Sequence, residues 1–144
     1  MEAYGRIANN QLTNNGSISW IQSGLWYINI SYNDTDNIKN AYFYTDFKMV
    51  RPDGSSLHKH FIKNFKSTNV IIERGKIIVN GIADVYSGKS LDYKETPIIV
   101  DLRNNAVLGL TVDTDMTQKH FASSSTNEIL GVLIENKDLD KLPS

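Results

Sequence analysis

The chain has 144 residues, 40% of them hydrophobic and 22% charged, a composition that predicts one globular domain able to fold by itself. Fifteen basic against sixteen acidic side chains leave a formal net charge of −1, so the sequence offers no electrostatic footprint for nucleic acid or anionic lipid. It contains no cysteine, which excludes disulfides, iron–sulfur clusters, thiolate metal ligands and thiol nucleophiles.

Short runs rich in Ile, Val, Tyr, Phe and Thr recur between turn residues, whereas helical periodicity is scarce. This pattern predicts an all-β fold, an antiparallel β-sandwich or a jelly-roll-like barrel of about eight or nine strands. In chain order the expected strands are residues 17–22, 25–32, 42–50, 57–66, 70–73, 76–85, 98–102, 107–112 and 129–134. We expect a single domain over residues 1–135 and a C-terminal tail over residues 136–144.

Turn-forming residues separate these strands. The Arg-Pro-Asp-Gly sequence of residues 51–54 predicts a hairpin, because Pro, Asp and Gly stand where a tight turn favours them. Arg74-Gly75, Ser87-Gly88 and Asn104-Asn105 mark three further reversals. Residues 113–127 are polar and lack a strong period, which indicates a long loop containing a helical turn. Loops of that length usually have a function.

Period-two alternation assigns the two faces of each strand. In the strand over residues 57–66 the expected core face consists of Leu57, Phe61 and Phe65. The opposite face of that strand carries His58, His60, Ile62 and Asn64. In the preceding strand one face carries Phe43, Phe47 and Met49, and the other carries Tyr42, Tyr44, Asp46 and Lys48.

The only histidines of the chain are His58, His60 and His120. His58 and His60 form an H-x-H pair on a predicted strand, so both imidazoles project from one face, with Cα atoms about 6.5–7 Å apart. Their third partner is expected to be His120, if the long loop folds back over this face. Three neutral imidazoles leave a fourth position for water, as in catalytic zinc sites. Scattered surface histidines, or a pH-sensing or buried hydrogen-bonded role, are the alternatives.

Imidazole suits zinc, copper, nickel and iron, and we expect one Zn²⁺ or Cu²⁺ per chain. A blue-copper centre is excluded because it needs a thiolate. Met116 is a candidate axial ligand for copper, although a core or loop methionine is the commoner role. Candidate acceptors for the outer N–H groups of the imidazoles are Asp46, Asp53, Asp113, Asp115 and Asn64.

The stretch from Phe47 to Gly54, the H-x-H of His58 and His60, and the later His120-Phe121 resemble small exported domains of ammonia-oxidising archaea. The likeness covers about half the chain and includes a glycine-containing strand like residues 79–85. It implies export and a metal-rich setting, with copper or zinc, and it brings no stated activity.

Three better-known families share parts of the pattern. An H-x-H with a late histidine is similar to the copper site of copper–zinc superoxide dismutases, but this chain lacks the bridging histidine, the zinc ligands and the disulfide cysteines. Cupins also pair H-x-H with a later histidine, yet their glutamate is missing here and Asn64 stands near its place. A three-histidine site with an open position looks like the centre of carbonic anhydrases, in which zinc lowers the pKa of its water to about 7.

Three functional hypotheses follow. The first is an extracytoplasmic metal-binding domain whose three-histidine site is open to water or a small ligand. The second is a metal-dependent hydratase or hydrolase of the carbonic-anhydrase type, and the third is a surface adhesion or assembly module without metal. No apolar run reaches the roughly 18 residues that span a bilayer. Glycosylation triplets at Asn15, Asn29 and Asn33 suit a secreted protein. Oligomeric state and substrate stay open.

Overall fold

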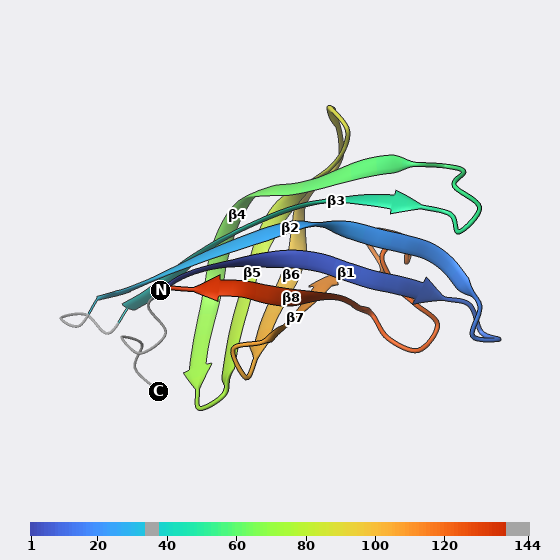
Figure 1. The fold of residues 1–144 in the computed structure, drawn as a ribbon. Coiled ribbons are helices and arrows are strands. Elements are labelled where there is room, and N and C mark those ends of the chain that lie inside the picture. Colours follow the sequence, from blue (N-terminus) through green and yellow to red (C-terminus); the bar gives the residue numbers. More distant parts are fainter. Residues whose placement is uncertain (34–37, 138–144) are drawn as a thin grey trace.

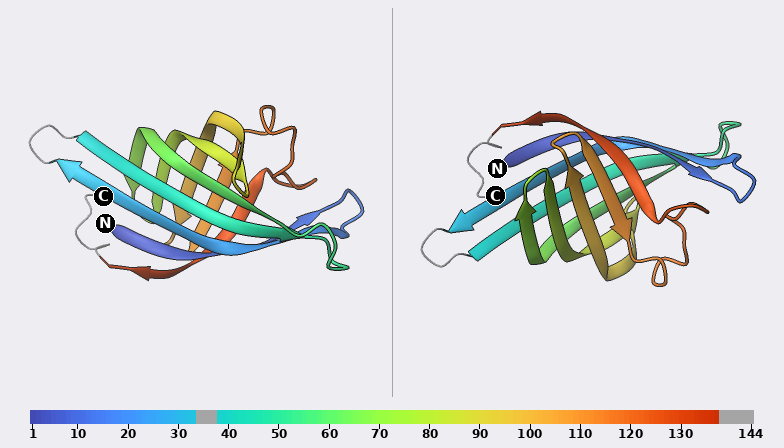
Figure 2. Two further views of the ribbon diagram at one scale, coloured as in Figure 1. Left: turned by 90° about the horizontal axis from the view of Figure 1, so that it is seen from above. Right: turned by 90° about the horizontal axis from the view of Figure 1, so that it is seen from below.

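A computed structural model describes residues 1–33 and 38–137. Its strands are β1 (Glu2–Leu12), β2 (Ile18–Asn33), β3 (Ile38–Val50), β4 (His58–Glu73), β5 (Lys76–Ser87), β6 (Ser90–Arg103), β7 (Val107–Val112) and β8 (Glu128–Asn136). Each strand pairs antiparallel with its chain neighbour, and β8 returns to β1, so the sheet closes into a barrel (Figure 1). The strands β1 to β3 cross the opposite wall of β5 to β7 at an angle (Figure 2). The all-β prediction is confirmed, with an up-and-down strand order.

The predicted reversals between the later strands are confirmed as hairpin turns. Gly75 joins β4 to β5 with φ of 73°, and Asn104 and Asn105 join β6 to β7 with φ of 50° and 52°. Gly88, with φ of 57°, joins β5 to β6. These left-handed conformations are the ones that glycine and asparagine adopt at low cost. Between β3 and β4 the amide of Gly54 donates to the carbonyl of Arg51 at 2.8 Å.

The first strand was not predicted, and two pairs of predicted strands are single strands. β1 is rich in Ala, Asn and Gln, which are poor strand formers, but it is paired on both sides, by β2 and by β8. Residues 17–22 and 25–32 merge into β2, and residues 57–66 and 70–73 merge into β4. Gly24 lies within β2 because the backbone of β3 approaches closely there, and a Cβ would overlap the carbonyl oxygen of Asp46.

The predicted face assignment is correct for β3 and partly wrong for β4. In β3 the inward side chains include Phe43, Phe47 and Met49, all fully buried. In β4 the inward face instead carries His58, His60 and Ile62, while Leu57 is 60% exposed. The Lys59 ammonium lies 4.9 Å from the centroid of the half-buried, outward-facing Phe61 ring. The alternation was therefore read correctly, but the histidine face is the interior of the barrel.

A β-bulge explains why Phe65 nevertheless reaches the core. The register between β4 and β5 shifts after Lys63, at Asn64, whose φ is 58°. The extra residue reverses the alternation, so Phe65 points inward and lies over Gly81. The carboxylate of Asp84 supports the bulge by accepting a hydrogen bond from the Asn64 amide at 2.9 Å.

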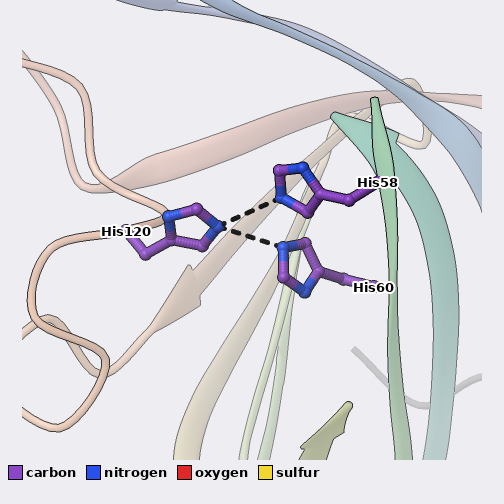
Figure 3. A group of neighbouring side chains, drawn as sticks. All are labelled: His58, His60 and His120. Carbon is purple, nitrogen blue, oxygen red and sulfur yellow. Dashed lines mark hydrogen bonds between the residues drawn. The ribbon is translucent and has the colours of Figure 1, made fainter. Parts of the chain in front are cut away.

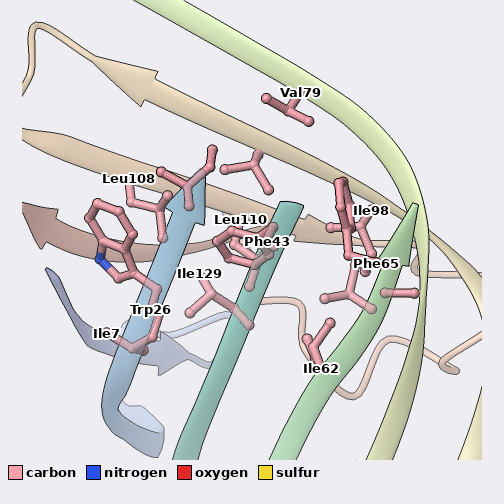
Figure 4. Packing of buried hydrophobic residues seen from close by; sticks show 14 of the residues in the cluster. Ile7, Trp26, Phe43, Ile62, Phe65, Val79, Ile98, Leu108, Leu110 and Ile129 are labelled. Atoms are coloured by element: carbon pink, nitrogen blue, oxygen red, sulfur yellow. The ribbon is translucent and has the colours of Figure 1, made fainter. Parts of the chain in front are cut away.

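The apolar core occupies the barrel interior (Figure 4). Its largest member, Trp26, is fully buried and spans the interior side of β1 and β8. A Cβ at Gly5 would collide with the Trp26 indole, and one at Gly131 would lie 3.1 Å from its Nε1. Burying an aromatic side chain of this size contributes about 2–3 kcal/mol from the area removed from water.

One end of the barrel, here called the mouth, holds the connections over residues 13–17, 51–57, 88–89 and 113–127. The predicted long loop over residues 113–127 is confirmed and consists largely of turns. It is fastened to the end of β1, because the Ser124 amide donates to the carbonyl of Leu12 at 3.1 Å and its hydroxyl donates to that of Thr13 at 2.9 Å. The loop therefore lies at a fixed place on the mouth. Within the described residues, no helix is long and apolar enough to cross a membrane.

Candidate metal centre

The three histidines meet inside the mouth of the barrel. His58 and His60 project inward from the start of β4, and His120 reaches them from the loop over residues 113–127 (Figure 3). The Nε2 atom of His120 lies 3.4 Å from Nε2 of His58 and 3.0 Å from Nε2 of His60. One nitrogen from each of the three lies within 4.8 Å of the others. The predicted convergence of the three side chains is confirmed.

This spacing fits a metal site. Zinc binds imidazole nitrogen at about 2.0–2.1 Å with tetrahedral angles, which places neighbouring ligand nitrogens about 3.3 Å apart. The separations of the His120 Nε2 atom from those of His58 and His60, 3.4 and 3.0 Å, bracket that value. The lone pairs of three facing imidazole nitrogens would repel one another if no proton or cation lay between them. A bound cation or shared protons would remove this repulsion.

Backbone carbonyls fix which nitrogen of the β4 histidines carries the proton. Nδ1 of His58 lies 2.8 Å from the carbonyl oxygen of Ser56, and Nδ1 of His60 lies 3.2 Å from that of Tyr86. A carbonyl oxygen can only accept, so each Nδ1 carries hydrogen, and in the neutral ring Nε2 keeps its lone pair. Both imidazoles therefore present a free ligand atom to the centre, as metal-binding histidines do.

A hydroxyl and a carboxylate extend this support for His60. The hydroxyl of Ser87 lies 3.3 Å from Nδ1 of His60 and donates a hydrogen bond to the carboxylate of Asp92. Ser87 is the residue of β5 directly opposite His60 in the sheet, so the strand register itself sets this contact. Asp92 on β6 therefore supplies a negative charge on the Nδ1 side of His60, with the Ser87 hydroxyl between the two side chains.

The acceptors expected from the sequence make other contacts. Asp46 faces outward and pairs with Lys59 at 3.3 Å, and Asp53 accepts from the amide and hydroxyl of Ser55 in the turn after β3. The carboxylate of Asp113 accepts from the amide of Met116 at 3.1 Å.

The remaining predicted acceptors, Asn64 and Asp115, and the predicted copper ligand Met116 also make no hydrogen bond to an imidazole among the described contacts. Asn64 binds Asp84, and the backbone carbonyl of Asp115 accepts from the loop amide of Gln118. The Met116 side chain is 36% exposed. In the described part of the chain, the partners of the imidazole Nδ1 atoms are the carbonyl oxygens of Ser56 and Tyr86 and the hydroxyl of Ser87.

Aromatic side chains enclose the cluster on two sides. On the inner side the Phe121 ring lies 4.8 Å from His60 and 4.9 Å from His120, and Phe47 lies 5.8 Å from His60, measured between ring centroids. On the mouth side the Trp20 ring lies in T-shaped arrangements with His58 at 5.1 Å and with His120 at 6.1 Å. None of these contacts was predicted, because they join residues from four separate segments.

Burial is uneven across the three imidazoles, and it lowers the pKa of His60 and of His120. His60 is 3% exposed, whereas His58 and His120 are half-buried. Burial, together with the neighbouring imidazoles of His120 and His58, lowers the pKa of His60 to about 4. Burial and the His58 imidazole also lower the pKa of His120. His60 is therefore neutral at pH 7, the state a metal ligand requires.

A short left-handed segment positions His120. The two residues before it, Gln118 and Lys119, have φ of 54° and 61°. The amide of His120 donates to the carbonyl of Thr117 at 3.1 Å, and its own carbonyl accepts from the buried side-chain amide of Gln11 at 3.1 Å. The loop thus turns sharply before His120, and β1 holds the loop at His120 itself.

No protein-family model, curated protein or solved structure matches this chain. The likenesses drawn from the H-x-H and the late histidine therefore remain predictions, and the functional argument depends on the geometry of the cluster.

Proposed function

We propose that this protein binds one transition-metal ion, zinc or copper, at the mouth of its barrel through the Nε2 atoms of His58, His60 and His120. The observation that supports this most strongly is the direction of the three imidazoles, whose Nε2 atoms face one another at 3.0 and 3.4 Å. Carbonyl oxygens occupy the outer nitrogens of the two strand histidines. Surface histidines have no reason to share that orientation.

The donor set favours a borderline ion and leaves one position free. Three neutral nitrogens and no thiolate or carboxylate suit Zn²⁺ or Cu²⁺ better than hard cations such as Ca²⁺ and Mg²⁺. A bound zinc ion would act there as a Lewis acid toward water or another small ligand in the fourth position. The surrounding Phe47, Phe121 and Trp20 rings restrict solvent and hold the imidazoles in place.

The test is metal content by mass spectrometry on tag-free protein, before and after equilibration with Zn²⁺ or Cu²⁺. We expect about one ion per chain in the unmodified protein and a loss in His120→Ala, which removes one of the three ligands. Because His120 is in a loop, the circular dichroism spectrum of the barrel should persist in that variant.

Met116→Leu is the matched control, since it changes an exposed, polarisable side chain of the same loop and leaves all three imidazoles in place. It should retain the ion. Failure of the unmodified protein to bind either metal on titration, or full retention of metal by His120→Ala, would overturn the proposal.

A further inference from the structure

The two sides of the histidine cluster differ in how easily a ligand from solution can reach them. The inner side is closed by Phe47 and Phe121, which pack around His60, the most buried imidazole. The mouth side carries the half-buried His58 and His120. A ligand from solution therefore reaches the centre from the mouth, where Trp20 contacts His58 and His120.

A cation stands on that route. The guanidinium carbon of Arg51 lies 3.9 Å from the centroid of the Trp20 ring, which also contacts the His58 and His120 rings. One of its nitrogens, Nη1, donates to the carbonyl of Ser19 at 3.1 Å, which fixes the group against β2.

Arg51 carries no carboxylate partner among the ion pairs of residues 1–33 and 38–137. The nearest acid in sequence, Asp53, is engaged by the amide and hydroxyl of Ser55. A guanidinium has five N–H donors, and the contact with Ser19 uses one of them. Arg51 is an exposed residue, so a ligand from solution can reach its remaining donors next to Trp20.

The local charge favours an anion once a divalent ion is bound. Neutral imidazoles contribute no charge, so a divalent cation and Arg51 together outweigh the negative charges of Asp92, which is tied to Ser87, and of Asp53, which interacts with Arg51. A planar carboxylate or bicarbonate suits both groups, because one oxygen can bind metal while another accepts from the guanidinium.

We propose that the open position of this site takes a small carboxylate-type oxyanion, and that Arg51, stacked on Trp20, holds the anion's outer oxygen. This inference rests on the proposed three-histidine metal site. It adds a ligand class and a specificity-determining residue that the histidines alone do not define.

The experiment uses the full chain loaded with Co²⁺, whose visible absorption reports on its ligands, and titrates acetate, bicarbonate and neutral acetamide. Acetate and bicarbonate should change the spectrum at concentrations where acetamide does not. Arg51→Gln should weaken acetate binding about tenfold or more, the usual effect of losing a charge-assisted hydrogen bond, while the Co²⁺ affinity is unchanged.

Arg74→Gln is the control, because Arg74 lies in the β4–β5 turn at the opposite end of the barrel. It should bind acetate like the unmodified protein. Equal acetate affinity in Arg51→Gln, or no response of the cobalt spectrum to either anion, would overturn this inference. Failure of Co²⁺ to bind at all appears before any anion is added and would instead count against the metal site itself.

Discussion

Acidification should destabilise the metal-free protein through His60. In the folded barrel its pKa is held at about 4, first by burial and then by the neighbouring imidazoles. In the unfolded chain it returns to about 6.5. Between these values the unfolded state binds more protons, so the free energy of unfolding falls as the pH falls from about 6.5 to 4. A pKa difference of one corresponds to about 1.4 kcal/mol, so His60 should remove about 3 kcal/mol across the window.

Urea unfolding in the presence of a chelator, from pH 7.5 to 4.5, measures this loss. The comparison variant is His60→Gln, which keeps a polar side chain of similar length but does not titrate. The unmodified protein should lose stability more steeply than the variant as the pH falls. Contributions from His120 and from the carboxylates are common to both proteins. Parallel pH profiles would refute the reasoning, because they would mean that His60 is protonated as easily in the barrel as in the unfolded chain.

Three further outcomes are expected. Phe121→Ala should lower the free energy of unfolding by about 3–5 kcal/mol, because it empties a fully buried ring position beside His60; an unchanged urea midpoint would contradict this. Ser87→Ala should weaken zinc binding about tenfold in competition with a chelator, because its hydroxyl links Nδ1 of His60 to Asp92. Equal affinity would show that the Tyr86 carbonyl suffices. Cu²⁺ should quench the fluorescence of Trp20, and Trp20→Phe should lose most of that response.

Much of the site could be predicted because its chemistry is local. Period-two alternation places His58 and His60 on one side of any strand, whatever the surrounding fold. His120 was identified by scarcity, as the only other histidine, and the structure confirms that the three side chains meet. The outer contacts could not be predicted in the same way. Ser87 reaches His60 through the pairing of β4 with β5, and pairing register is not visible in single-strand patterns.

The fold was harder to predict where the pairing of strands far apart in the sequence determines the structure. β1 has weak strand propensity and exists because β2 and β8 pair with it on both sides. In β4 the alternation of Phe61 and Phe65 predicts the wrong core face, because the two rings lie on opposite sides of the strand. A closed barrel has a polar mouth as well as an apolar interior, so His58 and His60 face inward, and the bulge at Asn64 then turns Phe65 into the core.

The two consecutive left-handed residues before His120 imply that the strand histidines and the loop histidine differ in how easily substitutions can move them. His58 and His60 are set by a strand bonded on both edges, so moving them means re-registering the barrel wall. His120 is set by Gln118 and Lys119, non-glycine residues in a conformation that costs roughly 1 kcal/mol each. Lys119→Gly should relieve part of that cost and raise the free energy of unfolding by up to about 1 kcal/mol, and an unchanged or lower urea midpoint would argue against it. Changes in metal preference among variants of this barrel are therefore expected to arise in the loop, with the strand histidines kept.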